Sequence, residues 1–384
     1  MKFLGYRRSN STVGVRNHVL IFPTVVCSTE VSRMISNEVP GTVYANHSCG
    51  CAHVGEDKEQ AIRTMVGITG HPNVAGVLLV GNGCELITPD VIAEELAKVG
   101  QRVEIVNIQE AGGTTKCVEE GKRLAERLLA EASSMNREPI NVSELFLGME
   151  CGGSDAFSGL TANPSAGVAS DLLIGEGGTA MFSETTEMLG AEEILARRAV
   201  DDEVSKRIYE MIASAEARAM SFGADIRGAQ PAPGNIEGGL TTIEEKSLGC
   251  IHKGGSTTIM EVVKYGEKPR KKGLILMDGT AYDVMSNIGM LASGAQIIVF
   301  STGRGTPLGS PIAPVIKMST NSKTYQRMEE NFDINAGVII DGEGTIQSVG
   351  RQIFDKVLKV ASGELVRAEI LGHHEFDIHS MVVI

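Results

Sequence analysis

The chain has 384 residues, of which 35 are Lys or Arg and 48 are Asp or Glu, so that its formal net charge is −13. Hydrophobic residues make up 42% and charged residues 22%, which is the composition of an ordinary folded protein rather than of a disordered one. The acidic balance argues against a nucleic-acid or anionic-membrane partner, because both need a basic surface. A chain of this length predicts about two domains.

The sequence carries no sign of export or of a membrane span. A membrane helix needs about 20 apolar residues, and every apolar run in this sequence is much shorter. The N-terminus lacks the hydrophobic stretch of a signal peptide. Seven cysteines, an odd number in a long chain, favour reduced thiols and a cytoplasmic protein. Glycine is unusually frequent, with 45 of the 384 residues against an average share of about 7%. The glycines cluster beside Cys, Asp and Ser, which indicates binding loops.

The first third of the chain alternates between strand-like and helix-like segments. Strands are expected at residues 19–26, 42–45, 74–80 and 103–108, and helices at 28–37, 58–69, 88–98 and 112–132. This alternation predicts a doubly wound parallel sheet with helices on both faces, over residues 1–135. In such sheets, ligands bind beyond the carboxyl ends of the strands.

A polar stretch at residues 131–139 predicts the domain boundary. We expect a larger C-terminal α/β domain over residues 140–384, with apolar strands at 179–182, 274–277, 296–300 and 337–340. Residues 221–255 are rich in Gly and Pro and lack periodicity, which predicts a long functional loop. The predicted fold class is therefore α/β, with two α/β domains.

Cys51, Cys84 and Cys151 each stand shortly after an apolar strand, among glycines. Because strand ends converge on one crevice, and because thiolates with a nearby imidazole such as His47 suit iron or zinc, these residues indicate a metal site. The spacing is too wide for a zinc finger. The cysteines without polar neighbours are interpreted as small buried apolar side chains; these are Cys27, Cys117 and Cys250.

Two further stretches suggest substrate chemistry. Arg304 lies between glycines after the predicted strand at 296–300, where a guanidinium is well placed to bind a substrate carboxylate. His252 and Lys253 lie in the segment without periodicity, and either residue type serves as a base for a carbon acid.

Other motifs exclude functions or leave them open. The chain lacks both phosphate-loop patterns, and no Gly-x-Ser-x-Gly surrounds Ser154 and Asp155. Arg16, with Arg7 and Arg8, forms either an anion clamp or an arm that packs on another subunit. The histidines and glutamate of residues 373–379 suggest either a metal cluster or an interface segment.

Short motifs at residues 13–17, 47–51, 83–85, 151–164, 183–185, 237–255, 301–307 and 314–321 occur together and in this order. In these motifs the chain resembles the altronate/galactarate dehydratase family along nearly its whole length. It departs from the family pattern at residues 10–12, at Cys49 and at residues 279–283. These departures leave the identity of the acid open.

The resemblance implies an iron-dependent hydro-lyase that removes water from a sugar acid and leaves a 2-keto-3-deoxy acid. It further implies a large catalytic subunit that lacks the family's small antifreeze-like domain, pairs with a separate small subunit and forms a homo- or hetero-oligomer. Two alternatives remain: a carbon–sulfur lyase that acts on sulfolactate, and a subunit that binds sugar acids without turnover.

The chemistry and the resemblance together assign a role to each candidate residue. Abstraction of the proton beside a carboxylate builds an enediolate, which a metal and a guanidinium stabilise. The expected ion is Fe2+, either mononuclear or in an iron–sulfur cluster. The expected metal ligands are Cys51, Cys84 and Cys151, with His47 in reserve. The expected base is Lys253 or His252, and Asp155 and Glu184 are expected to orient the substrate hydroxyls or to deliver the acid. The expected substrate contacts are Arg304, Ser154, Asn163, Thr306 and Arg16.

Overall fold

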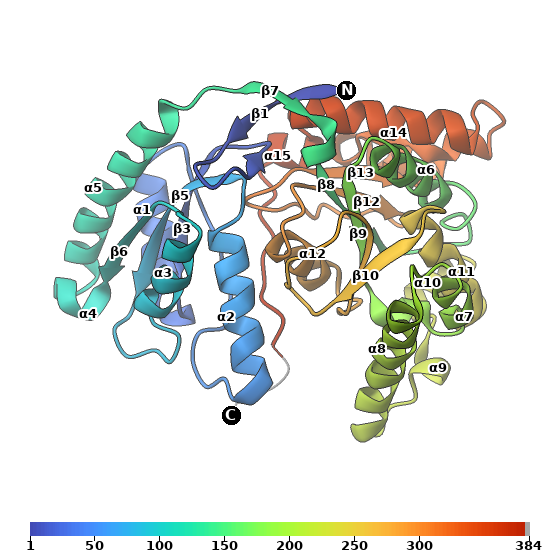
Figure 1. The fold of residues 1–384 in the computed structure, drawn as a ribbon, viewed down its shortest axis with the longest axis horizontal. Coiled ribbons are helices and arrows are strands. Elements are labelled where there is room, and N and C mark those ends of the chain that lie inside the picture. The colour runs from blue at the N-terminus through green and yellow to red at the C-terminus, as the bar shows by residue number, and fades with distance from the viewer. Residues whose placement is uncertain (381–384) are drawn as a thin grey trace.

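In a computed structural model that describes residues 1–380, the chain folds into two α/β halves that lie side by side (Figure 1). The N-terminal half is built on a four-stranded parallel sheet with the strand order β4-β3-β5-β6. Its strands are β3 (His18–Pro23), β4 (Thr42–Tyr44), β5 (Val74–Gly81) and β6 (Val103–Asn107). Its helices are η1 (Val26–Ser28), α1 (Thr29–Glu38), α2 (Gly55–Thr69), α3 (Pro89–Lys98), α4 (Ile108–Ala111) and α5 (Thr114–Ser133).

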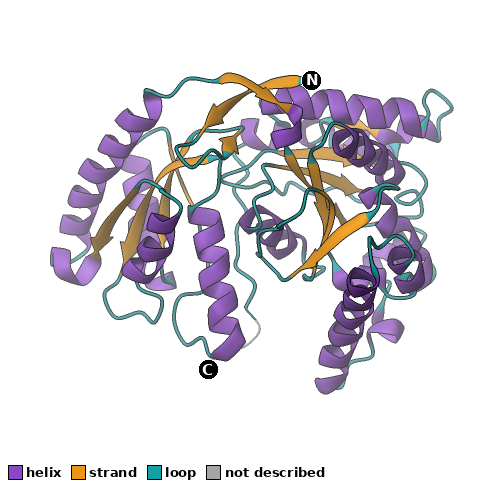
Figure 2. Cartoon of the chain, in the orientation of Figure 1, coloured by secondary structure: helices purple, strands orange, loops and turns teal. Residues whose placement is uncertain are grey.

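Helices cover both faces of this sheet (Figure 2), because its apolar strands are buried on both sides. Along β3, Val19 and Ile21 pack with α1 and α5, whereas Leu20 and Phe22 pack with α2 and α3. Successive residues of a strand point to opposite faces, so a continuous apolar run serves both layers. The prediction of an α/β fold with a doubly wound N-terminal sheet is confirmed.

The C-terminal half is built on a seven-stranded parallel sheet with the order β10-β11-β9-β8-β12-β13-β14. Its strands are β8 (Phe146–Gly152), β9 (Thr179–Phe182), β10 (Ile259–Val263), β11 (Gly273–Met277), β12 (Ile297–Thr302), β13 (Val315–Ser319) and β14 (Ile334–Asn335). Its helices are η2 (Val142–Glu144), α6 (Ala162–Gly175), η3 (Thr185–Met188), α7 (Glu192–Ala196), α8 (Asp202–Ser221), α9 (Ile226–Ala229), α10 (Pro233–Glu237), α11 (Ile243–Ile251), η4 (His252–Gly254), α12 (Asp283–Ala292), α13 (Ser322–Arg327), η5 (Glu329–Asn331), η6 (Ala336–Ile339), α14 (Ile346–Ala361) and α15 (Arg367–Ile370).

Two predictions about the C-terminal half are wrong. Residues 337–340, expected as a strand, mostly form the 3-10 helix η6, because the Asn335 side chain accepts a hydrogen bond from Gly337 N at 2.9 Å and so caps a turn. Residues 221–255, expected as a loop, contain α9, α10 and α11. These helices are short, and α9 and α10, with four and five residues, fall below the length at which helical periodicity is visible.

The two halves are joined by a shared core and by both ends of the described chain. Strand β1 (Lys2–Arg7) pairs antiparallel with β2 (Val13–Gly14) and with β7 (Glu138–Asn141), which leads into the C-terminal half. Helices α2 and α12 pack closely, since a Cβ on Gly67 would lie 2.3 Å from Ala292 O. Near its end the chain returns between the halves (Figure 1), where Gln60 Nε2 donates to His379 O at 3.1 Å. Within the described chain, no helix combines the length and the apolar character needed to cross a bilayer.

Candidate functional site

Four side chains that offer metal-ligand atoms meet near the carboxyl end of β8 in the C-terminal half: Cys151, Glu184, Glu187 and Cys250. We call them the cysteine–glutamate cluster. Cys151 is the penultimate residue of β8, Glu184 and Glu187 belong to the turn that follows β9, and Cys250 lies in α11. Strands β8 and β9 are neighbours in the parallel sheet, so their carboxyl ends bring these loops together.

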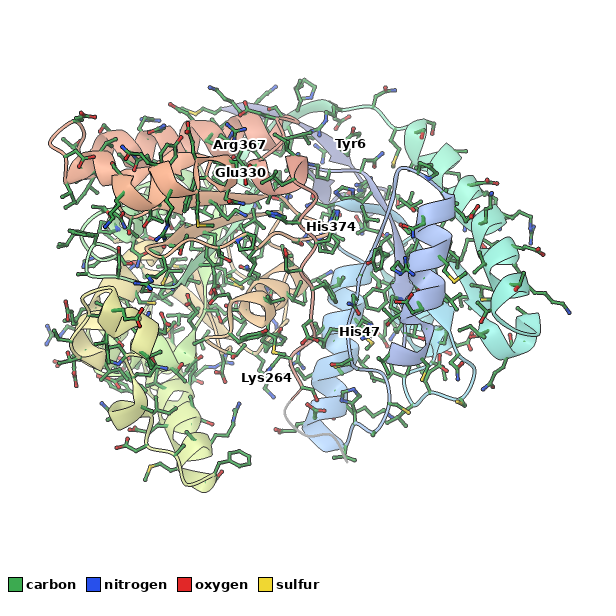
Figure 3. The ribbon with its side chains drawn as sticks, turned by 180° about the vertical axis from the view of Figure 1, so that it is seen from behind. Tyr6, His47, Lys264, Glu330, Arg367 and His374 are labelled. Atoms are coloured by element: carbon green, nitrogen blue, oxygen red, sulfur yellow. The ribbon has the colours of Figure 1, made fainter. Side chains whose placement is uncertain are left out.

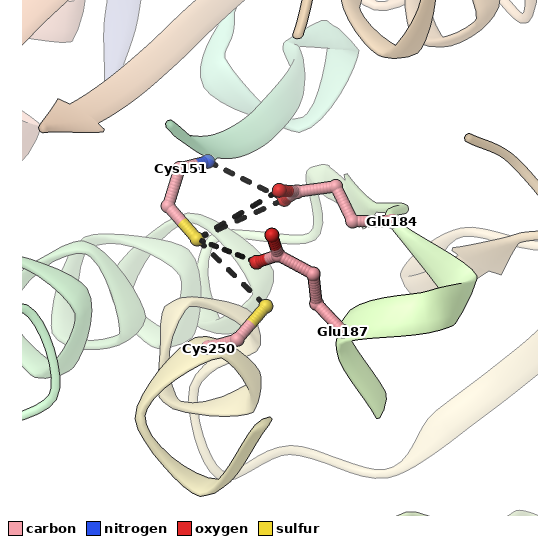
Figure 4. Close-up of side chains that lie close together, drawn as sticks. All are labelled: Cys151, Glu184, Glu187 and Cys250. Atoms are coloured by element: carbon pink, nitrogen blue, oxygen red, sulfur yellow. Dashed lines mark hydrogen bonds between the residues drawn. The ribbon is translucent and has the colours of Figure 1, made fainter. Parts of the chain in front are cut away.

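Cys151 lies at the centre of the cluster (Figure 4). Its Sγ lies 3.7 Å from Cys250 Sγ, 3.8 Å from Glu187 Oε2, and 3.8 and 3.9 Å from the two carboxylate oxygens of Glu184. Its backbone N–H donates to Glu184 Oε2 at 3.3 Å. All four residues are buried.

A buried lysine completes the cluster. Lys253 Nζ lies 2.9 Å from Cys250 Sγ and 3.2 Å from Cys151 Sγ, and it forms an ion pair with Glu184. Cys250 and Lys253 are three residues apart where α11 runs into η4, and this spacing puts them on one side of a helical turn. The side chains of Lys253 and Glu184 are 0% exposed.

Burial and close contact shift the acidity of these groups. Burial lowers the pKa of Lys253, but the surrounding Cys151, Cys250, Glu184 and Glu150 outweigh it and raise the pKa well above its usual range. Burial, with Cys151 and Glu150 close by, raises the pKa of Glu184. The hydrogen bond to Cys250, together with burial, raises the pKa of the Cys151 thiol. Lys253 is therefore held as an ammonium, whereas Glu184 binds a proton more strongly than an exposed carboxylate does.

Two more carboxyl groups lie beside the cluster, the buried Glu150 and the half-buried Asp283. Glu150 Oε2 accepts a hydrogen bond from Ser286 Oγ at 2.6 Å, and within the described chain its Oε1 has no partner. Burial raises the pKa of Glu150 to about 8 and that of Asp283 to about 6. Both groups are therefore able to exchange protons near neutral pH.

The turn that carries Glu184 is strained. Glu184 has φ 71° and ψ 57°, the left-handed region, which costs a residue with a Cβ about 1 kcal/mol or more. Its neighbour Thr185 fixes this conformation, because Thr185 Oγ1 donates to Asp278 Oδ1 at 3.0 Å and accepts from Gly279 N at 2.9 Å. The loop after β11 thus holds the loop after β9 in place.

A cavity of about 230 Å³ adjoins the cluster on the side of α11. Lys246 connects the two, because it lines the cavity and its Nζ lies 2.7 Å from Glu187 Oε1. Four of the residues predicted from the sequence line the same cavity, namely Ser154, Asp155, Asn163 and His252.

Two of these four side chains are largely engaged in holding loops together. The Asp155 carboxylate accepts from Thr320 Oγ1 at 2.8 Å and from Asn321 Nδ2 at 3.0 Å. Asn163 donates to Gly249 O at 3.0 Å and accepts from Ser301 Oγ at 2.5 Å. Both residues therefore fix the walls of the cavity.

Arg304 and Thr306 lie outside this cavity. Arg304 lines a separate cavity of about 370 Å³, which shares Asp155 with the first, and its exposed guanidinium pairs with Glu237 Oε2 at 2.9 Å. Thr306 Oγ1 accepts a hydrogen bond from Leu308 N at 3.3 Å, within its own loop.

Arg16 is engaged entirely within the chain. Its five N–H groups donate to both carboxylate oxygens of Glu369, at 2.6 and 2.8 Å, and to the carbonyls of Val15, Val360 and Glu364. A guanidinium has five donors, so none is left for a substrate. Arg16 fastens the start of the N-terminal half to α14 and α15, and the geometry does not support the predicted role in substrate binding.

The structure does not bring the predicted metal ligands together. Cys51 and Cys84 are exposed and follow β4 and β5 of the four-stranded sheet, whereas Cys151 belongs to the other sheet. His47, labelled in Figure 3, has both ring nitrogens engaged, by Pro23 O at 2.6 Å and by Cys49 N at 3.2 Å. Strand ends converge only within one sheet, which is why three similar sequence settings did not form one site. Among the described residues, the group of metal-ligand atoms that does converge is the cysteine–glutamate cluster.

The sequence interpretation missed Cys250, Glu187 and Lys246. Cys250 was expected to be an apolar filler, but its sulfur lies 2.9 Å from the Lys253 ammonium. A signal was present, because Glu184 and Glu187, like Cys250 and Lys253, are spaced by one helical turn. Such pairs become informative only once the two loops are known to meet.

The donor set of the cluster suits a divalent metal ion. Cysteine sulfur and carboxylate oxygen are ligands of zinc and iron, and these four ligand atoms lie within 4.8 Å of one another. The Lys253 ammonium now balances their charge, since it contacts Cys151, Cys250 and Glu184. Metal binding would therefore require Lys253 to lose its proton or to move aside.

Comparison with known proteins agrees with this organisation into two halves. Residues 5–133 match the family described as D-galactarate dehydratase/Altronate hydrolase, second domain, and residues 142–384 match the family described as D-galactarate/Altronate dehydratase, C-terminal. The chain is 40% identical over 382 residues to the galactarate dehydratase (L-threo-forming) of Escherichia coli (strain K12), an alignment that covers 94% of this chain and 73% of that protein.

Two further relatives are of similar identity. The altronate dehydratase of Bacillus subtilis (strain 168) is 36% identical over 382 residues, covering 96% of this chain and 75% of that protein. The (2R)-sulfolactate sulfo-lyase subunit beta of Chromohalobacter salexigens is 36% identical over 376 residues, covering 97% of this chain and 96% of that protein. The chain therefore belongs to the D-galactarate/altronate dehydratase family.

Proposed function

We propose that the protein is a hydro-lyase that removes water from a sugar acid and leaves a 2-keto-3-deoxy acid. The observation that carries this proposal is the buried Lys253–Glu184 pair beside Cys151, at the carboxyl edge of the larger sheet. Dehydration of a hydroxy acid needs a base for a weakly acidic C–H bond and a positive charge beside the developing enediolate. A buried carboxylate and a buried ammonium in contact supply both.

The surroundings of these two residues lead us to assign Glu184 as the base. Lys253, whose pKa is raised by its anionic neighbours, holds its proton and is a weak base. Glu184, whose pKa is raised by burial, accepts a proton more readily. Lys253 then stabilises the negative charge of the enediolate, and the protons of Glu150 or Asp283, with pKa values of about 8 and 6, are available for the departing hydroxide.

We further propose that the cysteine–glutamate cluster holds Fe2+ in the active enzyme through Cys151, Cys250 and Glu187, which leaves Glu184 free to act as the base. A bound Fe2+ would act as a Lewis acid that stabilises negative charge on the substrate carboxylate. In that state Lys253 would leave the sulfur atoms, and its raised pKa would fall toward the usual range because the metal neutralises the surrounding anions.

The test is turnover by the purified protein, prepared without oxygen and assayed with and without Fe2+. Galactarate and altronate should yield a 2-keto acid in wild type, whereas Lys253→Met should yield none. Iron and acid-labile sulfide are measured on the same samples. Stoichiometric iron without sulfide supports a mononuclear ion, and failure of wild type to turn over either acid contradicts the proposal.

A second candidate function is a carbon–sulfur lyase that acts on sulfolactate. The observation in its favour is that the match extends over 96% of the sulfo-lyase subunit, against 73% and 75% of the two dehydratases. The enediolate would be the same, and sulfite would leave in place of hydroxide. Sulfite release from sulfolactate, with no keto acid formed from galactarate or altronate, would establish this activity instead. A partner subunit is part of both proposals, supported by the name of this relative.

A further inference from the structure

We propose that the sugar acid binds in the large cavity at the junction of the two halves, with its carboxylate on Arg218 and Lys264 and its hydroxyls facing Asp278. This inference rests on the function proposed above and names where its substrate is held. The cavity has a volume of about 610 Å³ and is lined by α2 of the N-terminal half, by α8, and by the loops that follow β10 and β11. Helices α2 and α8 face each other across it (Figure 1), and Lys264 lies at the junction of the halves (Figure 3).

The charges in this cavity are balanced but unpaired. Six charged side chains line it, three of each sign, namely Glu56, Glu59, Arg63, Arg218, Lys264 and Asp278. Among the residues that the structure describes, none of these six forms an ion pair with another, and the side chains of Arg218 and Lys264 have no hydrogen-bond partner. Arg63 donates through its Nε to Tyr265 O at 2.8 Å, which leaves its other N–H groups for a ligand.

A polyhydroxy carboxylate satisfies both kinds of charge at once. Guanidinium and ammonium groups bind a carboxylate, and carboxylates accept hydrogen bonds from hydroxyl groups. Asp278 is suited to this second role, because its Oδ1 already accepts from Thr185 Oγ1 at 3.0 Å and its other oxygen remains available. A simple inorganic anion would use the cations but leave the second oxygen of Asp278 and the carboxylates of Glu56 and Glu59 without a ligand to bind.

The wall of this cavity is also the wall of the cysteine–glutamate cluster. Thr186 lines the cavity, and it lies in η3 between Glu184 and Glu187, which contact Cys151. Gly279 lines the cavity from the opposite loop and accepts a hydrogen bond from Thr185 N at 3.2 Å. Because Glu184 and Lys253 are fully buried, Arg218 and Lys264 hold the acid in an initial complex in this proposal, and the reaction requires the strained turn to move.

The other two cavities at this edge are less suited to a carboxylate. In the cavity beside α11, the one lysine is Lys246, whose Nζ is engaged by Glu187 at 2.7 Å and by Gln230 at 3.0 Å. In the cavity beside β12, Arg304 is paired with Glu237, Arg327 donates to Arg304 O at 2.8 Å, and the third cation, Lys323, is exposed to solvent. Arg218 is the arginine at this edge whose guanidinium has no partner within the described chain.

The experiment compares Arg218→Gln with two matched variants in steady-state assays on galactarate and altronate. Arg207→Gln removes a charge from the same helix, outside the cavity, and Arg304→Gln tests the carboxylate ligand that the sequence favours. We expect Arg218→Gln to raise KM about tenfold or more, the loss for one charge-assisted contact. We expect Arg207→Gln and Arg304→Gln to keep the wild-type KM, and circular dichroism to confirm that all three variants are folded.

The outcomes separate this inference from the function on which it rests. If wild type turns over sugar acids and Arg304→Gln raises KM while Arg218→Gln does not, the inference is overturned and the proposed function stands. If wild type is inactive on these acids, titration calorimetry with galactarate decides. If wild type binds galactarate and only Arg218→Gln loses this binding, the proposed binding site is supported although the proposed reaction is not. If wild type does not bind galactarate, the proposed binding site is overturned.

Discussion

Lys253 Nζ lies 2.9 Å from Cys250 Sγ, one helical turn earlier in the chain, and both side chains are buried. The ammonium also reaches Cys151 and Glu184, which come from two neighbouring strands. One positive charge therefore ties together three separate segments. Because burial of an isolated charge is costly, the contribution of this lysine to stability is measurable apart from any role in catalysis.

Replacing Lys253 by Met should lower the free energy of unfolding by about 3–5 kcal/mol, because it leaves the Glu184 carboxylate buried without its partner. The double variant Lys253→Met, Glu184→Leu should be less destabilised than the sum of the two single changes, since no charge then remains. The free energy of unfolding is measured by urea denaturation at neutral pH for wild type, for the two single variants and for the double variant. Strictly additive losses would show that the two side chains do not interact.

Replacing Cys250 by Ala should weaken Fe2+ binding by at least about 10–100-fold, the scale of effects that changes around a metal site produce. Cys117→Ala is the matched control, because Cys117 is also a buried cysteine but packs in the apolar core of the N-terminal half. Anaerobic equilibrium dialysis measures both variants. Equal affinities would remove Cys250 from the ligand set.

Glu150 should make the protein less stable as the pH rises. Burial raises the pKa of the folded carboxyl to about 8, above the about 4.3 of an exposed glutamate, so the folded state binds the proton more tightly than the unfolded state. The stability from this proton is complete below about pH 4 and is lost as the pH rises toward 8. Glu150→Gln should therefore lose less stability between pH 5 and pH 8 than wild type does.

Urea midpoints at pH 5, 6.5 and 8 test this expectation, and Glu119→Gln, an exposed change on α5, is the control. Parallel pH profiles for wild type and Glu150→Gln would mean that Glu150 is ionised throughout this range.

Arg16→Lys should destabilise the protein by about 2–4 kcal/mol without changing KM. A lysine cannot reproduce the five N–H contacts of the guanidinium, and buried acceptors that lose a donor cost about 1–3 kcal/mol each. Arg123→Lys serves as the control, because its contact with Glu120, at 3.8 Å, is exposed. A rise in KM with unchanged stability would restore the sequence-based view of Arg16 as a substrate ligand.

The alternating apolar segments were sufficient to predict the fold class and the doubly wound N-terminal sheet, because a parallel strand buried on both faces reads as a continuous apolar run. Local periodicity did not predict η6, whose formation depends on a capping contact from Asn335, or the helices α9 and α10, which are too short to show a period.

For the site, the sequence by itself predicted that Cys151 and Lys253 bear chemistry, since each stands in a polar or glycine-rich context, and the family resemblance added Glu184. Only the tertiary structure decided their partners. The order of strands in each sheet placed Cys51 and Cys84 on one sheet and Cys151 on the other, and the turn of α11 brought Cys250 beneath Lys253. Such contacts join residues about a hundred positions apart, and local pattern carries no information about distances of that kind.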